Sequence, residues 1–183
     1  MDRVRLRSYQ QEMLAASLER NVIVAMDTGS GKTHVAIARI AAELERTDPE
    51  KLVFFLSPSV ALAMQQASVL SEHLPSTQVR ALSGQDGVDK WTDQKLWDAV
   101  LANVQVVVAT PAVLLDALSH GFIKLARLAL LVFDEAHRAT KNHPMNAILQ
   151  RFYHPAKELG RQIPHVLGLS ASPVINSKQG SLE

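Results

Sequence analysis

The sequence predicts an α/β protein with a doubly wound, mostly parallel sheet and helices on both of its faces. Three observations lead to this prediction. Short runs rich in β-branched residues alternate with longer amphipathic stretches, which is typical of parallel strands joined by crossover helices. Several of the runs are apolar without alternation, as expected for strands covered on both faces. Turn-forming Gly, Pro, Asp and Ser residues separate the segments.

The first part of the chain predicts three helices and two strands. A helix at 9–19 precedes the strand 22–25, Val-Ile-Val-Ala, and an Ala- and Ile-rich helix follows at 32–45. An Asp-Pro turn ends that helix, and the apolar strand 52–56 then leads to a helix at 59–72.

The middle of the chain continues the alternation. A Pro-Ser turn precedes the strand 78–82, and Ser-Gly and Asp-Gly turns follow it. A helix at 89–102, a strand at 104–109 and a helix at 112–118 come next, and a His-Gly turn ends the last of them.

The last part of the chain predicts a strand at 129–133, a helix at 145–152 and a strand at 165–169. The sequence then turns small and polar. We therefore expect one domain over residues 1–175 and the truncated start of a linker at 176–183.

The composition fits one globular domain, with 183 residues of which 47% are hydrophobic. A net charge of +1 indicates no particular partner, because a binding surface can be local. The chain has no cysteine, which excludes disulfides and zinc-cysteine clusters and favours a reducing compartment. No apolar run reaches the roughly 18 residues that span a membrane, and no signal core is present. We expect no membrane partner and a cytoplasmic location, with the nucleus as the alternative.

A glycine-rich loop joins the first strand to the helix at 32–45. The loop reads Met26-Asp27-Thr28-Gly29-Ser30-Gly31-Lys32-Thr33. Strand, loop and helix together are the context of a P-loop, although Met26 stands where the general pattern has its first glycine. The two glycines let backbone N–H groups surround a phosphate, which Lys32 would also reach, while Thr33 offers a hydroxyl to Mg²⁺. The alternative, a glycine turn beside a surface lysine, does not account for the flanking strand and helix.

Two carboxylates follow the apolar strand at 129–133, in the sequence Asp134-Glu135-Ala136-His137. In an open α/β sheet, ligands bind at the carboxyl ends of the strands, so this pair and the P-loop are expected to meet. Asp134 is a candidate to bind Mg²⁺, either directly or through one of the ligands of the ion. Glu135 is a candidate to orient and deprotonate the attacking water molecule. Alone, the pair would indicate only a helix cap with a solvated neighbour.

Three segments, residues 29–33, 134–137 and 169–173, resemble motifs I, II and III of superfamily 2 helicases, and the resemblance covers nearly the whole chain. It implies a single RecA-like P-loop domain that binds ATP and Mg²⁺ and is half of a nucleic-acid-dependent ATPase. It implies catalytic roles for Lys32, Asp134 and Glu135. It also implies that motif III, Ser170-Ala171-Ser172, couples the Asp-Glu pair to nucleic acid, whereas two serines after a strand would alone indicate a loop.

Residues 6–10, Leu-Arg-Ser-Tyr-Gln, resemble the adenine-reading Q motif of the same family. The resemblance implies that Gln10 hydrogen-bonds the adenine edge and that Arg7 packs on its ring. The alternative for this segment is an exposed basic N-terminus with Ser8 as a helix N-cap.

Six residues are candidates for contact with a nucleic-acid backbone, because their segments resemble motif Ia and the Thr-Pro element of the family. They are Ser57, Pro58, Gln65, Gln66, Thr110 and Pro111. Without the resemblance, such residues are more often caps and turn starters.

Within the superfamily, residues 88–91 and 94–100, together with residues 6–10 and 167–173, look most like the helicase region of fungal Dicer-like proteins. This resemblance implies action on double-stranded RNA, in RNA silencing and antiviral defence. It also implies a second RecA-like domain, whose arginine completes the γ-phosphate site, and ribonuclease regions, none of which this sequence contains. We therefore expect a fragment or a truncated gene product with weak ATP hydrolase activity on its own.

The activity that these residues favour is Mg²⁺-dependent phosphoryl transfer from ATP to water. The alternative is a nucleotide-dependent RNA-binding module without significant turnover or unwinding. A P-loop kinase is disfavoured, because no segment resembles a lid or an acceptor site and Leu-Ser-Ala-Ser-Pro would have no role in one.

Overall fold

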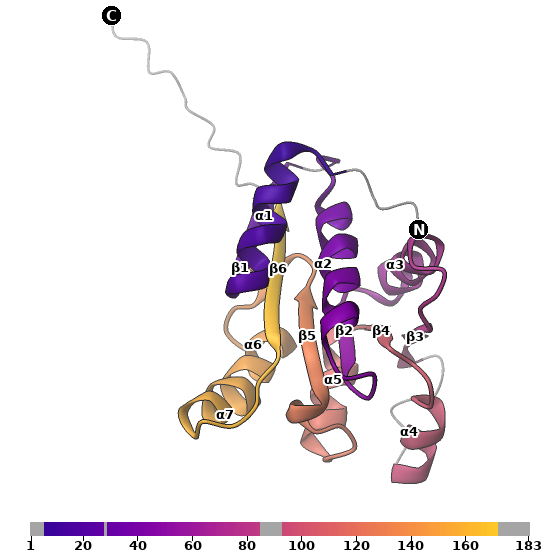
Figure 1. Cartoon of the computed structure of the whole chain (residues 1–183). Helices are drawn as coiled ribbons and strands as arrows, with labels where there is room; N and C mark the ends of the chain where they lie inside the picture. The colour runs from indigo at the N-terminus through magenta and orange to yellow at the C-terminus, as the bar shows by residue number, and fades with distance from the viewer. Residues whose placement is uncertain (1–5, 28, 85–92, 172–183) are drawn as a thin grey trace, which may run out of the picture.

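The computed structural model describes residues 6–27, 29–84 and 93–171 of the chain. Its six strands form one sheet in the order β1-β6-β5-β2-β4-β3, and all five pairings between neighbours are parallel. Figure 1 shows helices in front of this sheet and behind it, so the predicted architecture is confirmed. Among these residues no helix combines the length and the apolar character that a bilayer span requires.

Each predicted strand is present, with ends within two residues of those expected from the apolar runs. The strands are β1 Val22–Met26, β2 Leu52–Leu56, β3 Val79–Leu82, β4 Val106–Ala109, β5 Leu128–Phe133 and β6 His165–Ala171.

The helices also follow the predicted order. They are α1 Ser8–Glu19, α2 Lys32–Arg46, α3 Val60–His73, α4 Gln94–Val100, α5 Pro111–Ser119, α6 Pro144–Ile148 and α7 His154–Glu158, with shorter turns η3 Leu125–Arg127, η4 Ala136–Arg138 and η5 Leu149–Tyr153. Helix α4 begins at Gln94, where the Asp93 side chain accepts a hydrogen bond from the backbone N–H of Lys95. The first part of the helix predicted at 89–102 lies outside the described residues.

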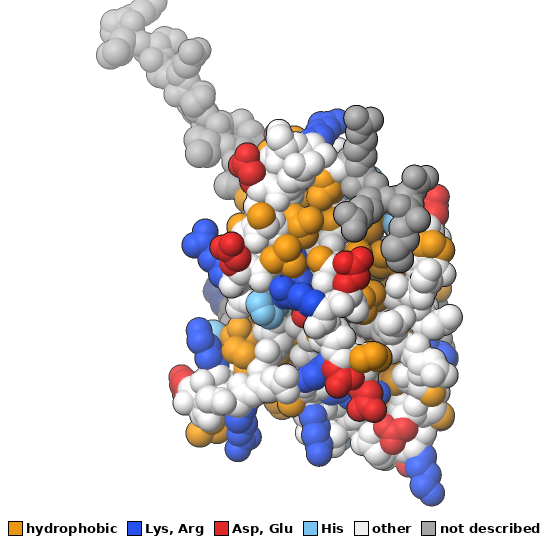
Figure 2. Space-filling view, viewed as in Figure 1, with side chains coloured by type: hydrophobic (Ala, Val, Ile, Leu, Met, Phe, Trp, Pro, Cys, Tyr) orange, Lys and Arg blue, Asp and Glu red, His pale blue; other side chains and the backbone are white. Residues whose placement is uncertain are grey.

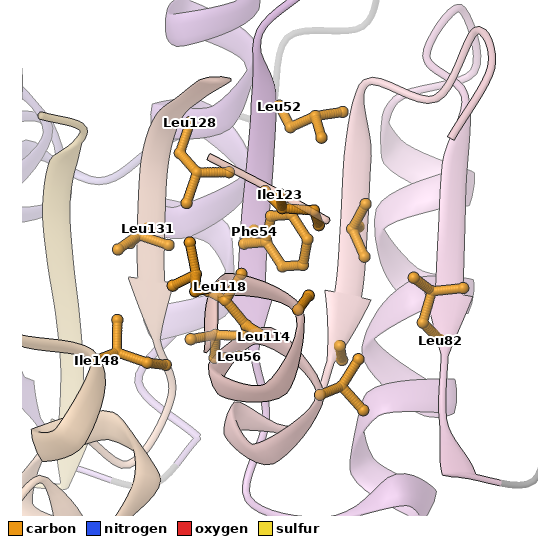
Figure 3. Packing of buried hydrophobic residues seen from close by; sticks show 14 of the residues in the cluster. Leu52, Phe54, Leu56, Leu82, Leu114, Leu118, Ile123, Leu128, Leu131 and Ile148 are labelled. Atoms are coloured by element: carbon orange, nitrogen blue, oxygen red, sulfur yellow. The ribbon is translucent and has the colours of Figure 1, made fainter. Parts of the chain in front are cut away.

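The strands are apolar on both faces because the sheet separates two cores. In β2, the side chains of Leu52, Phe54 and Leu56 pack with α5 and α6, as Figure 3 shows for Phe54 near Leu114 and Leu118. Phe55, on the other face of the same strand, packs with α2 and α3. Full burial of one such side chain contributes about 1.5–3 kcal/mol, so both faces of β2 specify its position.

The helix predicted at 145–152 is longer in the structure. It runs from α6 through the π-helical turn η5 into α7 and ends at Glu158. Pro155 does not stop it, because this residue lies in the first turn of α7, where its missing N–H is not required. The prediction ended too early because π-helical turns have no simple sequence signature.

A charged cluster that the sequence analysis did not predict holds α2 against α1. Arg39 is 0% exposed, forms an ion pair with Glu43, and donates from Nε to the Ser17 carbonyl at 3.1 Å. Arg46 donates from Nη2 to the same Glu43 carboxylate at 2.7 Å. Burial lowers the pKa of Arg39, and the neighbouring Glu43 opposes that shift. Removing one partner of a buried pair costs about 3–5 kcal/mol, so these three side chains act as one structural unit.

Candidate functional site

The predicted site residues gather at one edge of the sheet. Because every strand is parallel to its neighbours, the carboxyl ends of β1, β2, β4, β5 and β6 all lie on the same side, which is the upper edge in Figure 1. This is the edge at which open α/β sheets bind ligands. Thr28 and Ser172 lie outside the described residues.

The loop between β1 and α2 has the backbone conformation that its glycines permit. Gly29 and Gly31 have φ values of 80° and 91°, in the left-handed region, and Gly31 is the N-cap of α2. Inside the loop, the N–H of Ser30 donates to the Asp27 carbonyl at 3.1 Å, and the Ser30 hydroxyl donates to the same oxygen. The loop therefore turns tightly into a helix N-terminus, which attracts anions.

Lys32, the first residue of α2, directs its amine back into the loop. Its Nζ donates to the carbonyl oxygens of Met26 at 2.8 Å and Asp27 at 3.3 Å. An ammonium group has three donors, so one remains for another acceptor in this conformation. Thr33, the next residue, is partly buried.

Asp134 follows β5 directly and is partly buried. Its backbone N–H donates to the Leu56 carbonyl at 2.9 Å, and its Oδ1 accepts from the N–H of Glu135 at 3.1 Å. Burial, and secondly the charge of Glu135, raise the pKa of the Asp134 carboxyl, while the Glu135 N–H and the charge of Lys32 oppose this shift. A carboxyl with such a pKa favours the approach of a further positive charge.

Glu135 adopts a left-handed backbone conformation, with φ 53° and ψ 48°. For a residue other than glycine this conformation costs about 1–2 kcal/mol, and such strain is common at functional sites. The Oε2 of Glu135 lies 3.3 Å from Nδ1 of His137, and that same nitrogen lies 3.1 Å from Oγ of Ser170.

The contact between His137 and Ser170 joins the segment after β5 to the end of β6. The Ser170 hydroxyl donates its only proton to the Ala171 carbonyl, at 3.2 Å. Nδ1 of His137 lies within reach of both the Ser170 hydroxyl and the Glu135 carboxylate, and a proton on this nitrogen would be donated to either of them. Motif II and the described part of motif III are thus in direct contact.

Gly168 in β6 explains how the segment after Asp134 lies so close to the sheet. A Cβ at this position would lie 3.0 Å from the Ala136 side chain and 3.1 Å from that of Ile23. The glycine therefore makes room for η4 over β6. Sequence analysis did not assign it a role, because the need for a small residue arises only from packing across the sheet.

Gln10 lies beside the glycine loop and is 5% exposed. Its Oε1 accepts from the Arg7 N–H at 2.9 Å, and its Nε2 donates to the carbonyls of Ser30 at 3.2 Å and Gly31 at 3.4 Å. A Cβ on Gly31 would overlap this amide, so the glycine also permits the close approach of Gln10. The N-cap of α1 is Arg7, whose backbone N–H donates to the Gln10 side chain, so the alternative that placed Ser8 there is wrong.

Tyr9 provides a second tie to the glycine loop, and sequence analysis did not single it out. Its hydroxyl donates to the Ser30 carbonyl at 3.1 Å and accepts from Nη1 of Arg7 at 3.4 Å. Next to these groups is a hollow of about 220 Å³. It is lined by Arg7, Gln10, Gly29, Ser30, Gly31 and His34. The predicted Q-motif residues and the P-loop therefore enclose one space.

The six candidate nucleic-acid contacts differ in exposure. Ser57 is fully buried, its Oγ has no hydrogen-bond partner among the described residues, and Pro111 is also buried. Gln65 is exposed, whereas Pro58, Gln66 and Thr110 are partly buried. A strand lying along this edge would meet the exposed and partly buried residues first, and their roles remain predictions.

Metal ligands are sparse at this edge. In the ranges that the structure describes, no three His, Asp or Glu side chains are grouped so that they could hold a metal ion by themselves. A Mg²⁺ beside Asp134 and Thr33 would therefore need further ligands, such as phosphate oxygens and water.

Comparison with known proteins identifies relatives of this arrangement. The family model described as DEAD/DEAH box helicase matches residues 7–179. The chain is 54% identical to Dicer-like protein 2 of Aspergillus fumigatus over 178 residues, which are 96% of this chain and 13% of that protein. It is 52% identical to Dicer-like protein 2 of Pyricularia oryzae over 177 residues, covering 97% and 12% of the two chains.

A solved structure gives the same result for the fold. The crystal structure of the Pyrococcus furiosus Hef helicase domain superposes with a TM-score of 0.75 at 30% identity, over 92% of this chain and 33% of that one. The resemblances to superfamily 2 helicases and to fungal Dicer-like proteins are thus confirmed as similarities, and the chain spans only about an eighth of the length of these Dicer-like relatives.

Proposed function

Since the chain belongs to the DEAD/DEAH box helicase family, we propose that it is the ATP-binding half of an ATPase motor that acts on double-stranded RNA. The observation that carries the proposal is the convergence of the P-loop and the Asp-Glu pair. The charge of Lys32 acts on the carboxyl of Asp134, although about a hundred residues separate them in the sequence. An anionic ligand on the loop and a cation on Asp134 would fit side by side.

The residues of this edge suit phosphoryl transfer to water. Lys32 supplies positive charge at the helix N-terminus, where the β- and γ-phosphates of ATP are expected. Asp134 and Thr33 would hold Mg²⁺, which neutralises phosphate charge when it is bound. Glu135 would accept the proton of the attacking water, and His137 orients this carboxylate through Nδ1.

The preference for RNA and the biological role rest on similarity. The identity with Dicer-like protein 2 supports a role in RNA silencing and antiviral defence, with double-stranded RNA as the partner. We further propose a domain over residues 1–175, a linker from 176, and a second RecA-like domain as partner. The lack of cysteine supports the cytoplasm as its location, or the nucleus.

A nucleotide-dependent RNA-binding module without turnover is the second candidate function. The contacts of the two proposed catalytic groups favour this candidate, because both groups are already engaged within the chain. The Lys32 amine donates to carbonyls of its own loop, and the Glu135 carboxylate lies against His137. Turnover of radiolabelled ATP, measured with and without double-stranded RNA, distinguishes a motor from a passive binder.

Lys32→Ala is expected to weaken ATP binding while the fold is kept. The lost amine would make charge-assisted hydrogen bonds to phosphate worth about 1.5–3 kcal/mol, which is roughly a 10- to 150-fold loss of affinity. Titration calorimetry with ATP and Mg²⁺ measures it. Lys51→Ala is the matched control, because the Lys51 amine also donates to a backbone carbonyl, that of Ala126. Parent-like affinity in a folded Lys32→Ala protein would remove the phosphate site from this loop.

Gln10→Ala is expected to erode a preference for ATP over GTP. The side-chain amide offers a donor and an acceptor that match the adenine edge, so ATP should lose about 2- to 12-fold in affinity, corresponding to roughly 0.5–1.5 kcal/mol. Displacement of a fluorescent nucleotide by ATP and by GTP measures the preference.

Tyr9→Phe separates base recognition from support of the loop. This variant removes a hydrogen bond to the same Ser30 carbonyl but leaves the Gln10 amide in place. It should weaken ATP and GTP alike and keep their ratio. Equal affinities for ATP and GTP in the parent chain would show that Gln10 only supports the loop.

A further inference from the structure

A second hollow lies at the opposite edge of the sheet. It has a volume of about 390 Å³ and lies between the end of α5, the segment leading into β5, and the helical run of η5 and α7. Both β5 and β6 begin near it, whereas the candidate ATP site lies where they end. The two sites are therefore separated by the length of the sheet.

The floor of this hollow is apolar. Leu118, Ile123, Leu125 and Phe152 line it, and Leu159, just after α7, stands at its side with 66% of its surface exposed. Few large hydrophobic residues of the described chain are so exposed. A hollow at the small end of the usual 300–1,000 Å³ range for ligand pockets suits one or two bulky side chains.

The hollow is electropositive. Lys124, Arg151 and Arg161 line it and are exposed, and no Asp or Glu is among its lining residues. Within the described ranges, none of these three cations forms an ion pair. Figure 2 shows Lys and Arg side chains beside hydrophobic ones at the lower left of the molecule, where α7 lies in Figure 1.

We propose that this hollow is a docking site for an acidic segment of a partner protein. One bulky apolar side chain of the segment would fill the floor, and carboxylates on either side would pair with Arg151, Arg161 and Lys124. Arginine forms two parallel hydrogen bonds to a carboxylate, which adds geometric specificity to the attraction. The charge complementarity selects an acidic occupant, and the apolar floor selects a peptide.

A nucleic-acid backbone satisfies only half of these features. Its phosphates would pair with the cations, but they would leave Leu159 and Phe152 in contact with water. A peptide covers both kinds of group, as the apolar centre and polar rim of protein interfaces do. The inference does not depend on ATP binding, because the hollow shares no residue with the candidate ATP site.

The test is a selection of random 12-residue peptides displayed on phage against the immobilised 183-residue chain. Enriched peptides should carry a bulky apolar residue flanked by Asp or Glu. Synthetic labelled copies should bind in fluorescence anisotropy, and the double variant R151E/R161E should lose at least about tenfold in affinity.

Two further variants make the result specific. Leu159→Ser should also weaken binding, although it changes no charge. Lys157→Glu is the matched control, because it reverses a charge on α7, between the tested positions in sequence, at a residue that does not line the hollow. Thermal melts confirm that each variant is folded, which is expected because the substituted side chains are exposed.

Four results would overturn the inference. They are no enrichment, enriched peptides without net negative charge, equal binding by R151E/R161E, and displacement of the peptide from the parent by an RNA whose own binding R151E/R161E abolishes. Sedimentation tests the alternative that a second copy of the chain occupies the hollow. Self-association that R151E/R161E abolishes would show a second copy in place of a partner segment.

Discussion

Glu135→Gln is expected to lose ATP hydrolysis by about 10²- to 10⁴-fold and to keep Mg²⁺-dependent ATP binding, because the amide cannot accept the proton of the attacking water. The substitution keeps the size of the side chain and leaves the backbone N–H that donates to Asp134. Hydrolysis is measured with radiolabelled ATP in a chain extended through the next RecA-like domain, and binding by calorimetry.

Asp134→Ala is expected to behave differently, because its role is to hold the metal. Binding of ATP should lose its dependence on Mg²⁺ while the binding that needs only the P-loop remains. Burial raises the pKa of Asp134, and Mg²⁺ requires the deprotonated carboxylate, so in the parent Mg²⁺ affinity should rise as the pH rises through that pKa. Glu158→Gln, at an exposed position, is the control and should bind and hydrolyse ATP like the parent. If Glu135→Gln and Asp134→Ala behave in the same way as this control, the Asp-Glu pair is only a helix cap.

Much of the fold could be predicted because the information is local. The apolar runs of β2 and β5 are buried on both faces, and that burial determines both their position and their secondary structure. The placement of Lys32 and Asp134 at one edge of the sheet followed from one further inference, that parallel strands end at the same edge.

The features that sequence analysis missed depend on long-range contacts. Arg39 appears on a helix as an ordinary charged residue, and only the packing of α1 on α2 buries it against the Ser17 carbonyl. Tyr9 and Gln10 both bond the Ser30 carbonyl across about twenty residues of chain, which no periodicity indicates. The αL conformation of Glu135 was equally hidden, because glycine is the usual marker of that conformation.

The next expected result concerns what one RecA-like domain can do alone. This chain should hydrolyse ATP very slowly, because the proposed site, with Lys32 and Glu135, would supply only one wall of the cleft. We propose, from the family resemblance, that an arginine for the γ-phosphate lies on a second domain. In related phosphoryl-transfer enzymes such an arginine contributes about 10³ to 10⁵ in rate, so extension of the chain through that domain should restore turnover on this scale.

Double-stranded RNA should increase the difference in ATP turnover between the short chain and the extended chain. In the extended chain RNA can bridge both domains and bring the arginine to the phosphates, so turnover should rise with RNA. In this chain RNA can meet only one wall, near Gln65 and Thr110, and should change turnover little. Radiolabelled ATP assays of both chains, each with and without RNA, give the comparison. Strong RNA-stimulated turnover by the short chain would contradict this prediction, unless sedimentation at the assay concentration shows that the chain self-associates. In that case a second copy would supply the arginine, and substitution of that arginine must abolish the stimulation.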